Sequence, residues 1–338
     1  MGDPIAVTTL ARTVGQCYIR TGRRLIEITV WRGKGSGVIH FPVSGVETYW
    51  WLPIVTAFGI SMVTSTGGLS GAFLLLPFQV SVLGFISPAV TPTNLLFNII
   101  ATPSGVYRYY REKRMVWPIT WITIIGTLPG LFLGVFIRTR YLPDPRPFKL
   151  FVALVLLYIG IRLAFDVIRA AKNSATMPKP AQPEQFEVTP LAFNLRQVGY
   201  EFNGRPYYVS TLPVFILSLV VGIIGGIYGI GGSAIIAPFL VTVFGLPVYT
   251  IAGAALFGNL VTSLAGVIAY VVITPLLSSS GPATQPDWLL GGLFGLGGAA
   301  GMYVGARLQR HLPARVIKAV LGLIMFYIAG SYILAFFH

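Results

Sequence analysis

Charged side chains are scarce in this sequence, and acidic ones are the rarest. Only 10% of the 338 residues are charged, and Asp and Glu together number 10. A soluble domain carries about 25% charged residues, so this chain has too few to cover a water-facing surface. The single cysteine, Cys17, excludes an internal disulfide and a cysteine-based metal site. No HExxH or GxSxG motif occurs, so we expect no catalytic residues, no metal and no cofactor, and do not expect an enzyme.

Hydrophobic residues are abundant and form long apolar runs. The chain is 54% hydrophobic, and its mean hydropathy is +0.76. Several apolar runs approach the roughly 20 residues that cross a bilayer core of about 30 Å as a helix. The composition therefore predicts an all-α polytopic membrane protein. The runs cover residues 49–66, 70–84, 92–107, 116–137, 148–168, 211–227, 233–246, 250–274, 287–306 and 315–337.

The net charge of +14 would suggest nucleic-acid binding in a soluble protein. Here Lys and Arg gather between the apolar runs, as in the cytoplasmic loops of membrane proteins. We therefore expect the lipid bilayer, and no nucleic acid, as the partner of a multi-pass protein in the inner (plasma) membrane. No short apolar N-terminal core with a cleavage site is visible, so no signal peptide is expected.

Two stretches of the chain repeat each other. The segment from Gly68-Leu69-Ser70-Gly71 to Pro77 aligns with the segment from Gly229-Ile230-Gly231-Gly232-Ser233 to Pro238. At the same offset of 161 residues, Gly84 meets Gly245 and Asn98 meets Asn259. The triplet Gly126, Gly130 and Gly134 corresponds to Gly297, Gly301 and Gly305. Duplicated membrane segments that each open with a glycine-broken helix are typical of secondary transporters.

The repeats divide the chain into four parts. Residues 1–48 form a basic extramembranous head, which fits an amphipathic surface helix, a strand pair or a solvated tail equally well. Residues 49–170 and 209–338 are the two transmembrane repeats, each with a glycine-broken helix or hairpin followed by three transmembrane helices. Residues 171–208 form a polar linker in which the Asn203-Gly204 pair predicts a small β-hairpin.

The charges of the loops indicate which side of the membrane each loop faces. Residues 108–114 and 307–318 are rich in Lys and Arg, whereas 275–286 contain neither. If the basic loops are cytoplasmic, the two repeats must be inverted and each must cross the membrane an odd number of times. That arrangement places the basic head outside. A parallel arrangement keeps the head inside but puts residues 307–318 outside, and we favour the inverted one because short loops report topology better than long tails.

The glycine breaks are candidate anion sites. A helix that begins at a break has unpaired N–H groups and a partial positive charge, which together bind anions without a fixed cation. Carboxylates are almost absent from the spans, Asp166 beside Arg162 being the exception, so no proton relay or cation site is obvious. The candidate substrate-binding residues lie at the breaks and on the helix downstream of each: Gly68, Ser70, Gly71, Asn94, Asn98, Gly229, Gly231, Gly232, Ser233, Asn259 and Ser263.

The second break, Gly229-Ile230-Gly231-Gly232-Ser233-Ala234-Ile235-Ile236-Ala237-Pro238-Phe239-Leu240, resembles the TauE/SafE (TSUP) family of sulfite and organosulfonate exporters. The first break departs from it, because Ser70 replaces the middle glycine and Ala72 stands where Ser233 does. The resemblance covers about residues 50–170 and 210–337. It implies transport of small sulfur-containing or carboxylated anions, such as sulfite or sulfoacetate. Together with the broken helices, it leads us to expect a secondary-type transporter that works by alternating access, with a midplane site between the two breaks.

Two other functions stay open from the sequence. A passive anion channel would share the fold. A membrane scaffold or enzyme would use the head and linker as its working parts. The sequence does not say which anion is moved, in which direction or with which coupling ion, and it allows a homodimer without requiring one.

Overall fold

The computed structural model describes most of the chain, and within it the protein is mainly helical. The described residues are 14–21, 24–31, 37–66, 70–111, 115–173, 188–194, 196–202, 204–232, 236–277, 284–308 and 314–337. The helices are α1 (Trp51–Thr66), α2 (Ala72–Ser81), α3 (Val90–Ala101), α4 (Pro103–Arg111), α5 (Trp117–Arg140), α6 (Pro145–Asn173), α7 (Thr211–Tyr228), α8 (Ile236–Thr242), α9 (Val248–Ile268), the π-helical η2 (Ala269–Ile273), α10 (Thr274–Leu277), α11 (Trp288–Leu308) and α12 (Ala314–Phe337).

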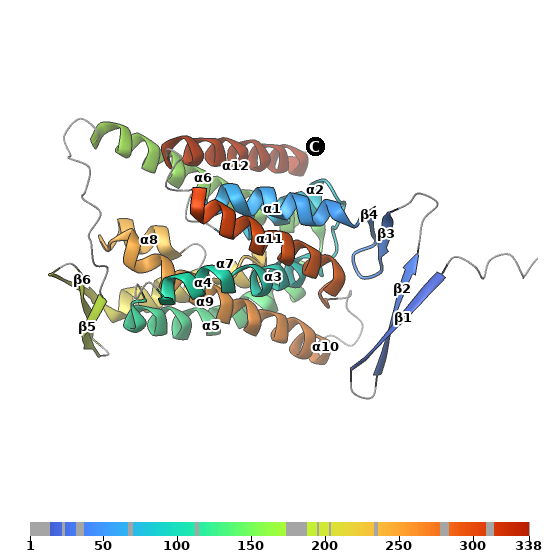
Figure 1. Ribbon diagram of the computed structural model, residues 1–338, viewed down its shortest axis with the longest axis horizontal. Coiled ribbons are helices and arrows are strands. Elements are labelled where there is room, and N and C mark those ends of the chain that lie inside the picture. Colours follow the sequence, from blue (N-terminus) through green and yellow to red (C-terminus); the bar gives the residue numbers. More distant parts are fainter. Residues whose placement is uncertain are drawn as a thin grey trace, which may run out of the picture.

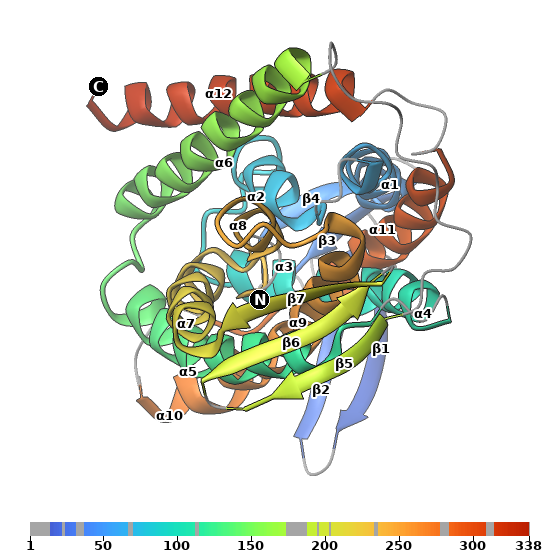
Figure 2. The ribbon, with the colours of Figure 1, turned by 90° about the vertical axis from the view of Figure 1, so that its left-hand side faces the viewer.

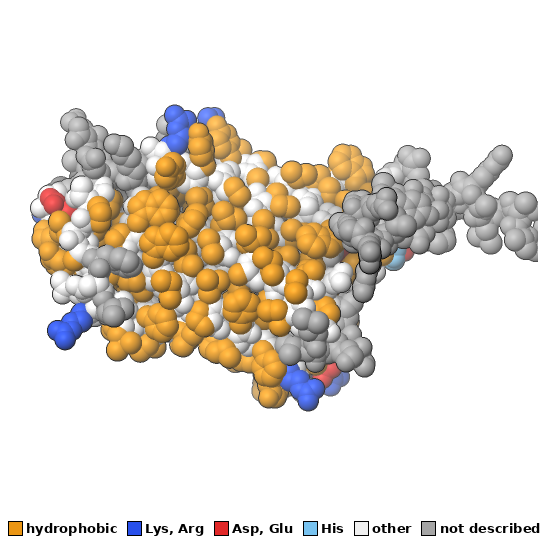
Figure 3. Space-filling model, turned by 90° about the horizontal axis from the view of Figure 1, so that it is seen from below, with side chains coloured by type: hydrophobic (Ala, Val, Ile, Leu, Met, Phe, Trp, Pro, Cys, Tyr) orange, Lys and Arg blue, Asp and Glu red, His pale blue; other side chains and the backbone are white. Residues whose placement is uncertain are grey.

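Within the described ranges, six helices are long and apolar enough to cross a membrane. Two further apolar helices, Trp51–Ser65 and Ala72–Ser81, are shorter. The surface seen in Figure 3 carries a broad apolar band, with Lys and Arg side chains towards its edges. Large apolar side chains such as Leu323 and Tyr327 face outward on α12. This is the surface of a chain whose solvent is lipid, and the predicted all-α polytopic class is confirmed.

Small antiparallel sheets lie at both ends of the helical body (Figure 1). At one end are two strand pairs, β1 (Val14–Thr21) with β2 (Arg24–Trp31), and β3 (Val38–Phe41) with β4 (Val46–Tyr49). The head therefore forms strand pairs, one of the three structures that the sequence left open. At the opposite end, β5 (Val188–Phe193), β6 (Gln197–Phe202) and β7 (Arg205–Ser210) form a three-stranded sheet. The linker thus adds a third strand to the β6–β7 hairpin.

The first helices of the two halves start at opposite ends of the body. Strand β4 leads directly into α1, and β7 leads directly into α7. The third helices of the two halves, α3 and α9, also start at opposite ends of the body. At the α3 start, Thr93 accepts a hydrogen bond from the N–H of Asp287, whose carboxylate binds Ser44 in the β3–β4 loop. At the α9 start, the hydroxyl of Thr250 is 2.9 Å from that of Tyr200 in β6. The chain therefore enters the two halves from opposite sides.

The glycine triplets on α5 and α11 pack each of these helices against the first helix of the other half. Helix α5 packs on α7 and α11 packs on α1. A Cβ atom at Gly130 would overlap the carbonyl oxygen of Leu219, and one at Gly301 would overlap that of Phe58. All six triplet glycines behave in this way, and their contact residues correspond at an offset of 161: Phe215, Leu219 and Ile223 on α7, and Ile54, Phe58 and Met62 on α1. Glycine permits this close backbone approach between membrane helices.

The short helices after the breaks end at corresponding positions. Helix α2 ends at Ser81 and α8 at Thr242. Each is followed by a glycine in the left-handed region, Gly84 with φ 68° and Gly245 with φ 67°. The chain therefore has the same backbone conformation at Gly84 and Gly245. Helices α6 and α12 pack against each other along one side of the body, as the end-on view shows (Figure 2).

Candidate functional site

The second glycine break ends α7 in the buried interior. Gly229 has φ 82° and closes the helix with a hydrogen bond to the carbonyl of Gly225. Gly231 has φ 77°, and L side chains are strained at such angles. The first break separates α1 from α2. Two of the predicted binding residues, Gly68 and Ser233, lie outside the described residues, as does the side chain of Asp166.

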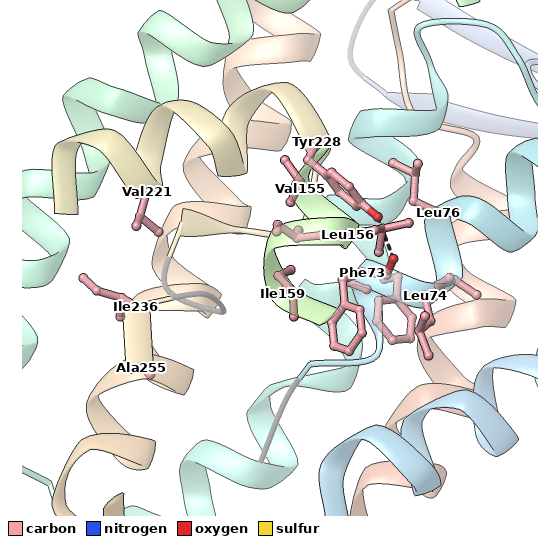
Figure 4. Packing of buried hydrophobic residues seen from close by; sticks show 14 of the residues in the cluster. Phe73, Leu74, Leu76, Val155, Leu156, Ile159, Val221, Tyr228, Ile236 and Ala255 are labelled. Atoms are coloured by element: carbon pink, nitrogen blue, oxygen red, sulfur yellow. Dashed lines mark hydrogen bonds between the residues drawn. The ribbon is translucent and has the colours of Figure 1, made fainter. Parts of the chain in front are cut away.

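The structure brings the two breaks together. The side-chain amide of Asn94 donates to the carbonyl of Ala72 at 2.9 Å and to that of Gly229 at 3.0 Å, so one side chain spans both breaks. Tyr228, the last residue of α7, donates to the carbonyl of Phe73 in α2 at 2.7 Å. Figure 4 shows this bond among the apolar side chains of α6, including Val155 and Leu156. The breaks are thus one structural unit made from both halves.

Ser70, Asn94 and Asn98 of the first half hydrogen-bond to one another or to the backbone of the two breaks. Asn98 donates to the carbonyl of Ile230 at 2.9 Å and accepts a hydrogen bond from Ser70 at 3.0 Å. The Ser70 hydroxyl also accepts from the N–H of Ala72. Asn94 and Asn98 are fully buried. In this conformation both asparagines satisfy carbonyls that the second break exposes.

In the second half, Asn259, which corresponds to Asn98, and Ser263 have no such partners in the described part of the chain. Asn259 is 1% exposed and Ser263 is fully buried. Among the described residues, no hydrogen-bond partner exists for either polar atom of the Asn259 amide or for the Ser263 hydroxyl. Both side chains face Gly231, where an added Cβ would overlap Asn259 Oδ1 and lie 2.9 Å from Ser263 Oγ. A buried unpaired polar group costs about 1–3 kcal/mol, so these atoms are candidates for binding a polar ligand.

One backbone donor of this break is already occupied. The N–H of Gly232 donates to the Thr262 hydroxyl at 3.2 Å. Gly232 is one of the candidate binding residues, and its N–H here ties the break to α9. The free groups beside Gly231 are therefore side chains.

Arg138 lies beside the same break and is not among the site residues predicted from the sequence. It is fully buried, and its Nε donates to Thr91, whose hydroxyl donates in turn to the carbonyl of Ile227. In the sequence it closes an apolar run and resembles a loop residue. Its spacing of four from Gly134 was the available signal, because it continues the face that the triplet buries against α7.

The fold and site together define a polytopic α-helical membrane protein with a buried polar site where two broken helices meet. The profile described as "Sulfite exporter TauE/SafE" matches residues 53–332. The chain belongs to this family, which confirms the resemblance seen in the sequence, and it is a membrane transporter.

Two relatives from Bacillus subtilis (strain 168) carry the same general description. "Probable membrane transporter protein YunE" is 21% identical over 268 residues, which cover 76% of this chain and 88% of the relative. "Probable membrane transporter protein YjnA" is 21% identical over 258 residues, with coverages of 76% and 89%. No solved structure matches the chain significantly.

Proposed function

We propose that this protein is a secondary-type transporter of small anions, most closely suited to sulfite or organosulfonates such as sulfoacetate, in the inner (plasma) membrane. The observation that carries the proposal is the pair of buried, unpartnered side chains, Asn259 and Ser263, beside the Gly231 break. The family description names sulfite export, and an amide and a hydroxyl are suitable donors for the oxygens of such an anion.

Burial of the site favours alternating access over a passive channel. Asn259 and Ser263 are almost fully enclosed, and Gly229 packs directly against Thr91. An anion reaches these groups only if the helices around the breaks rearrange. An open channel would instead need a continuous polar path. No described acid or base is hydrogen-bonded to Asn259 or Ser263, which suits binding rather than catalysis.

We also propose that the two halves are inverted repeats. Their first helices start at opposite ends, and their glycine triplets make equivalent contacts. At the end of α4, Tyr109 packs near Gly253 close to the α9 start, beside the β5–β7 sheet. Helix α4, which ends at Arg111, therefore ends on that side of the body. Because residues 108–114 are rich in Lys and Arg, we assign this side to the cytoplasm by the positive-inside rule. The β1–β4 end then faces outside.

The test measures binding and transport of sulfite, sulfoacetate and acetate by the purified full chain, using calorimetry and proteoliposome flux. We expect Asn259→Ala and Ser263→Ala each to weaken binding about tenfold or more, because each removes a hydrogen bond to a charged ligand worth about 1.5–3 kcal/mol. Ser331→Ala is the matched control, because its hydroxyl is exposed on α12.

Each result has a distinct meaning. Unchanged affinity in both Asn259→Ala and Ser263→Ala would show that the anion binds elsewhere. Flux that rises linearly with concentration without saturating would favour a channel. Binding of acetate alone would leave an anion transporter but remove sulfur oxyanions as its substrates.

A further inference from the structure

Arg138 is a buried cation with an incomplete set of partners. Its guanidinium lies 3.8 Å over the ring of Phe148. Nε donates to the Thr91 hydroxyl at 3.2 Å, and Nη1 donates to the carbonyl of Leu142. Within the described residues, Nη2 has no hydrogen-bond partner. A guanidinium carries five N–H donors in a planar fork, so part of its hydrogen-bonding capacity is unused.

The positive charge is also unbalanced. The partners of Arg138 are a hydroxyl, a carbonyl and an aromatic ring, and across the described ranges no carboxylate lies within ion-pair distance of it. The negative end of the α5 dipole offsets part of the charge. A buried ion without a counter-charge is nevertheless costly, and such groups are normally paired. In a membrane protein, a charged side chain in the interior is a candidate for function.

Arg138 is linked to the second break through Thr91. The Thr91 hydroxyl accepts from Arg138 and donates to the carbonyl of Ile227 at 3.3 Å. The Thr91 carbonyl lies so close to Gly229 that a Cβ there would overlap it. The Asn259 and Ser263 pair contacts the same break at Gly231. Arg138 is therefore joined through Thr91 to the same break that Asn259 and Ser263 contact at Gly231.

We propose that Arg138 forms a second anion subsite, in which its free Nη2 binds an oxygen of the transported oxyanion and the anion supplies the missing counter-charge. The inference rests on the proposed function and adds a fixed positive charge to a site otherwise made of neutral groups. Sulfonate, sulfite and carboxylate oxygens all suit a guanidinium, whose charge-assisted hydrogen bonds are short and strong. The subsite therefore selects for negative charge, whereas Asn259 and Ser263 select for hydrogen-bonding oxygens.

The experiment compares Arg138→Gln, Arg138→Lys and Arg140→Gln in proteoliposomes loaded with sulfite. Arg140 is the matched control, since it stands in the same last turn of α5 but is exposed. We expect Arg138→Gln to raise the KM for sulfite at least tenfold and to abolish most of the rise in Tm that sulfite produces. Arg138→Lys, which keeps the charge but loses the fork, should raise the KM by a smaller factor. Arg140→Gln should match the wild type.

A wild-type KM and a wild-type sulfite-dependent Tm shift in Arg138→Gln would overturn the proposal, whatever that variant does to basal stability. If Arg138→Gln does not fold, a wild-type KM in Arg138→Lys would overturn it equally. Failure of the proposed function looks different, because the wild-type protein and Arg140→Gln would then also show no sulfite transport and no Tm shift.

Discussion

Asn98 and Asn259 occupy corresponding positions but have different surroundings. The Asn98 amide is bound to the carbonyl of Ile230 and to the Ser70 hydroxyl, whereas Asn259 has no partner in the part of the chain that the structure describes. The difference begins with the sequence, because Ser70 stands where the second half has Gly231. A side chain at position 70 supplies a partner for its asparagine, and a glycine at 231 cannot. The same residue type thus has its hydrogen bonds satisfied in one half, whereas in the other half its amide is free for the anion that we propose.

This contrast yields a prediction about stability. Asn94→Ala leaves two buried carbonyls, those of Ala72 and Gly229, without the amide that now binds both. We expect it to lower the free energy of unfolding by about 2 kcal/mol or more, since each unsatisfied buried group costs about 1–3 kcal/mol. Asn259→Ala should cost less stability, because that amide has no described bonds to lose. Denaturant unfolding in detergent measures both, and a larger loss for Asn259→Ala would refute the assignment.

At the scale of elements, the glycine triplets determine how closely the helices pack. Gly130 and Gly301 occupy equivalent places in the α5–α7 and α11–α1 pairs. An added methyl group meets backbone atoms of the facing helix, which cannot turn aside as the end of a side chain can. The two crossings should therefore respond to substitution in the same way.

We expect Gly130→Ala and Gly301→Ala to lower the Tm by similar amounts and to reduce transport, because each forces its helix pair apart. Gly59→Ala is the control, because Gly59 lies in α1, within one of the two pairs. Among the described residues, no heavy atom outside its own stretch of α1 lies within 4 Å of the position its Cβ would take. Its Tm should stay at or above the wild-type value, since alanine favours a helix over glycine. Equal Tm values for all three variants would contradict close packing at the triplets.

At the scale of the whole molecule, the two sets of strands mark opposite ends of the helical body (Figure 1). The β3–β4 pair precedes α1, and the β5–β7 sheet precedes α7. A protein that crosses a membrane along this axis must expose the two sheets on different sides. This arrangement is what inverted repeats require.

The sidedness can be measured with single cysteines in a Cys17→Ser background. Glu47 in β4 and Arg205 in β7 are both exposed, so Glu47→Cys and Arg205→Cys are matched probes. In intact cells, we expect a membrane-impermeant maleimide to label Glu47→Cys and to label Arg205→Cys only after the membrane is opened. Labelling of both from the same side would contradict an odd number of crossings between the sheets.

Much of the architecture was determined by the sequence alone. The apolar runs predict membrane helices because bilayer thickness dictates their length, and the glycine clusters predict the breaks at 229–232 because backbone with positive φ favours glycine. The spacing of four within each triplet predicts a close helix contact. Each of these features depends on local geometry, which neighbouring residues in the chain specify.

Only the tertiary structure decided which polar groups are satisfied. The sequence predicts the same binding role for three asparagines, Asn94, Asn98 and Asn259. In the structure the first two bind carbonyls from the other half, and the third does not. The sequence also does not show that the α5 triplet packs on α7. The spacing of four from Gly134 places Arg138 on the same helix face, but it does not show that this side chain lies beside the second break. These facts depend on contacts between residues more than 40 positions apart. Hydrogen-bond satisfaction is a property of the assembled interior, and no local pattern encodes it.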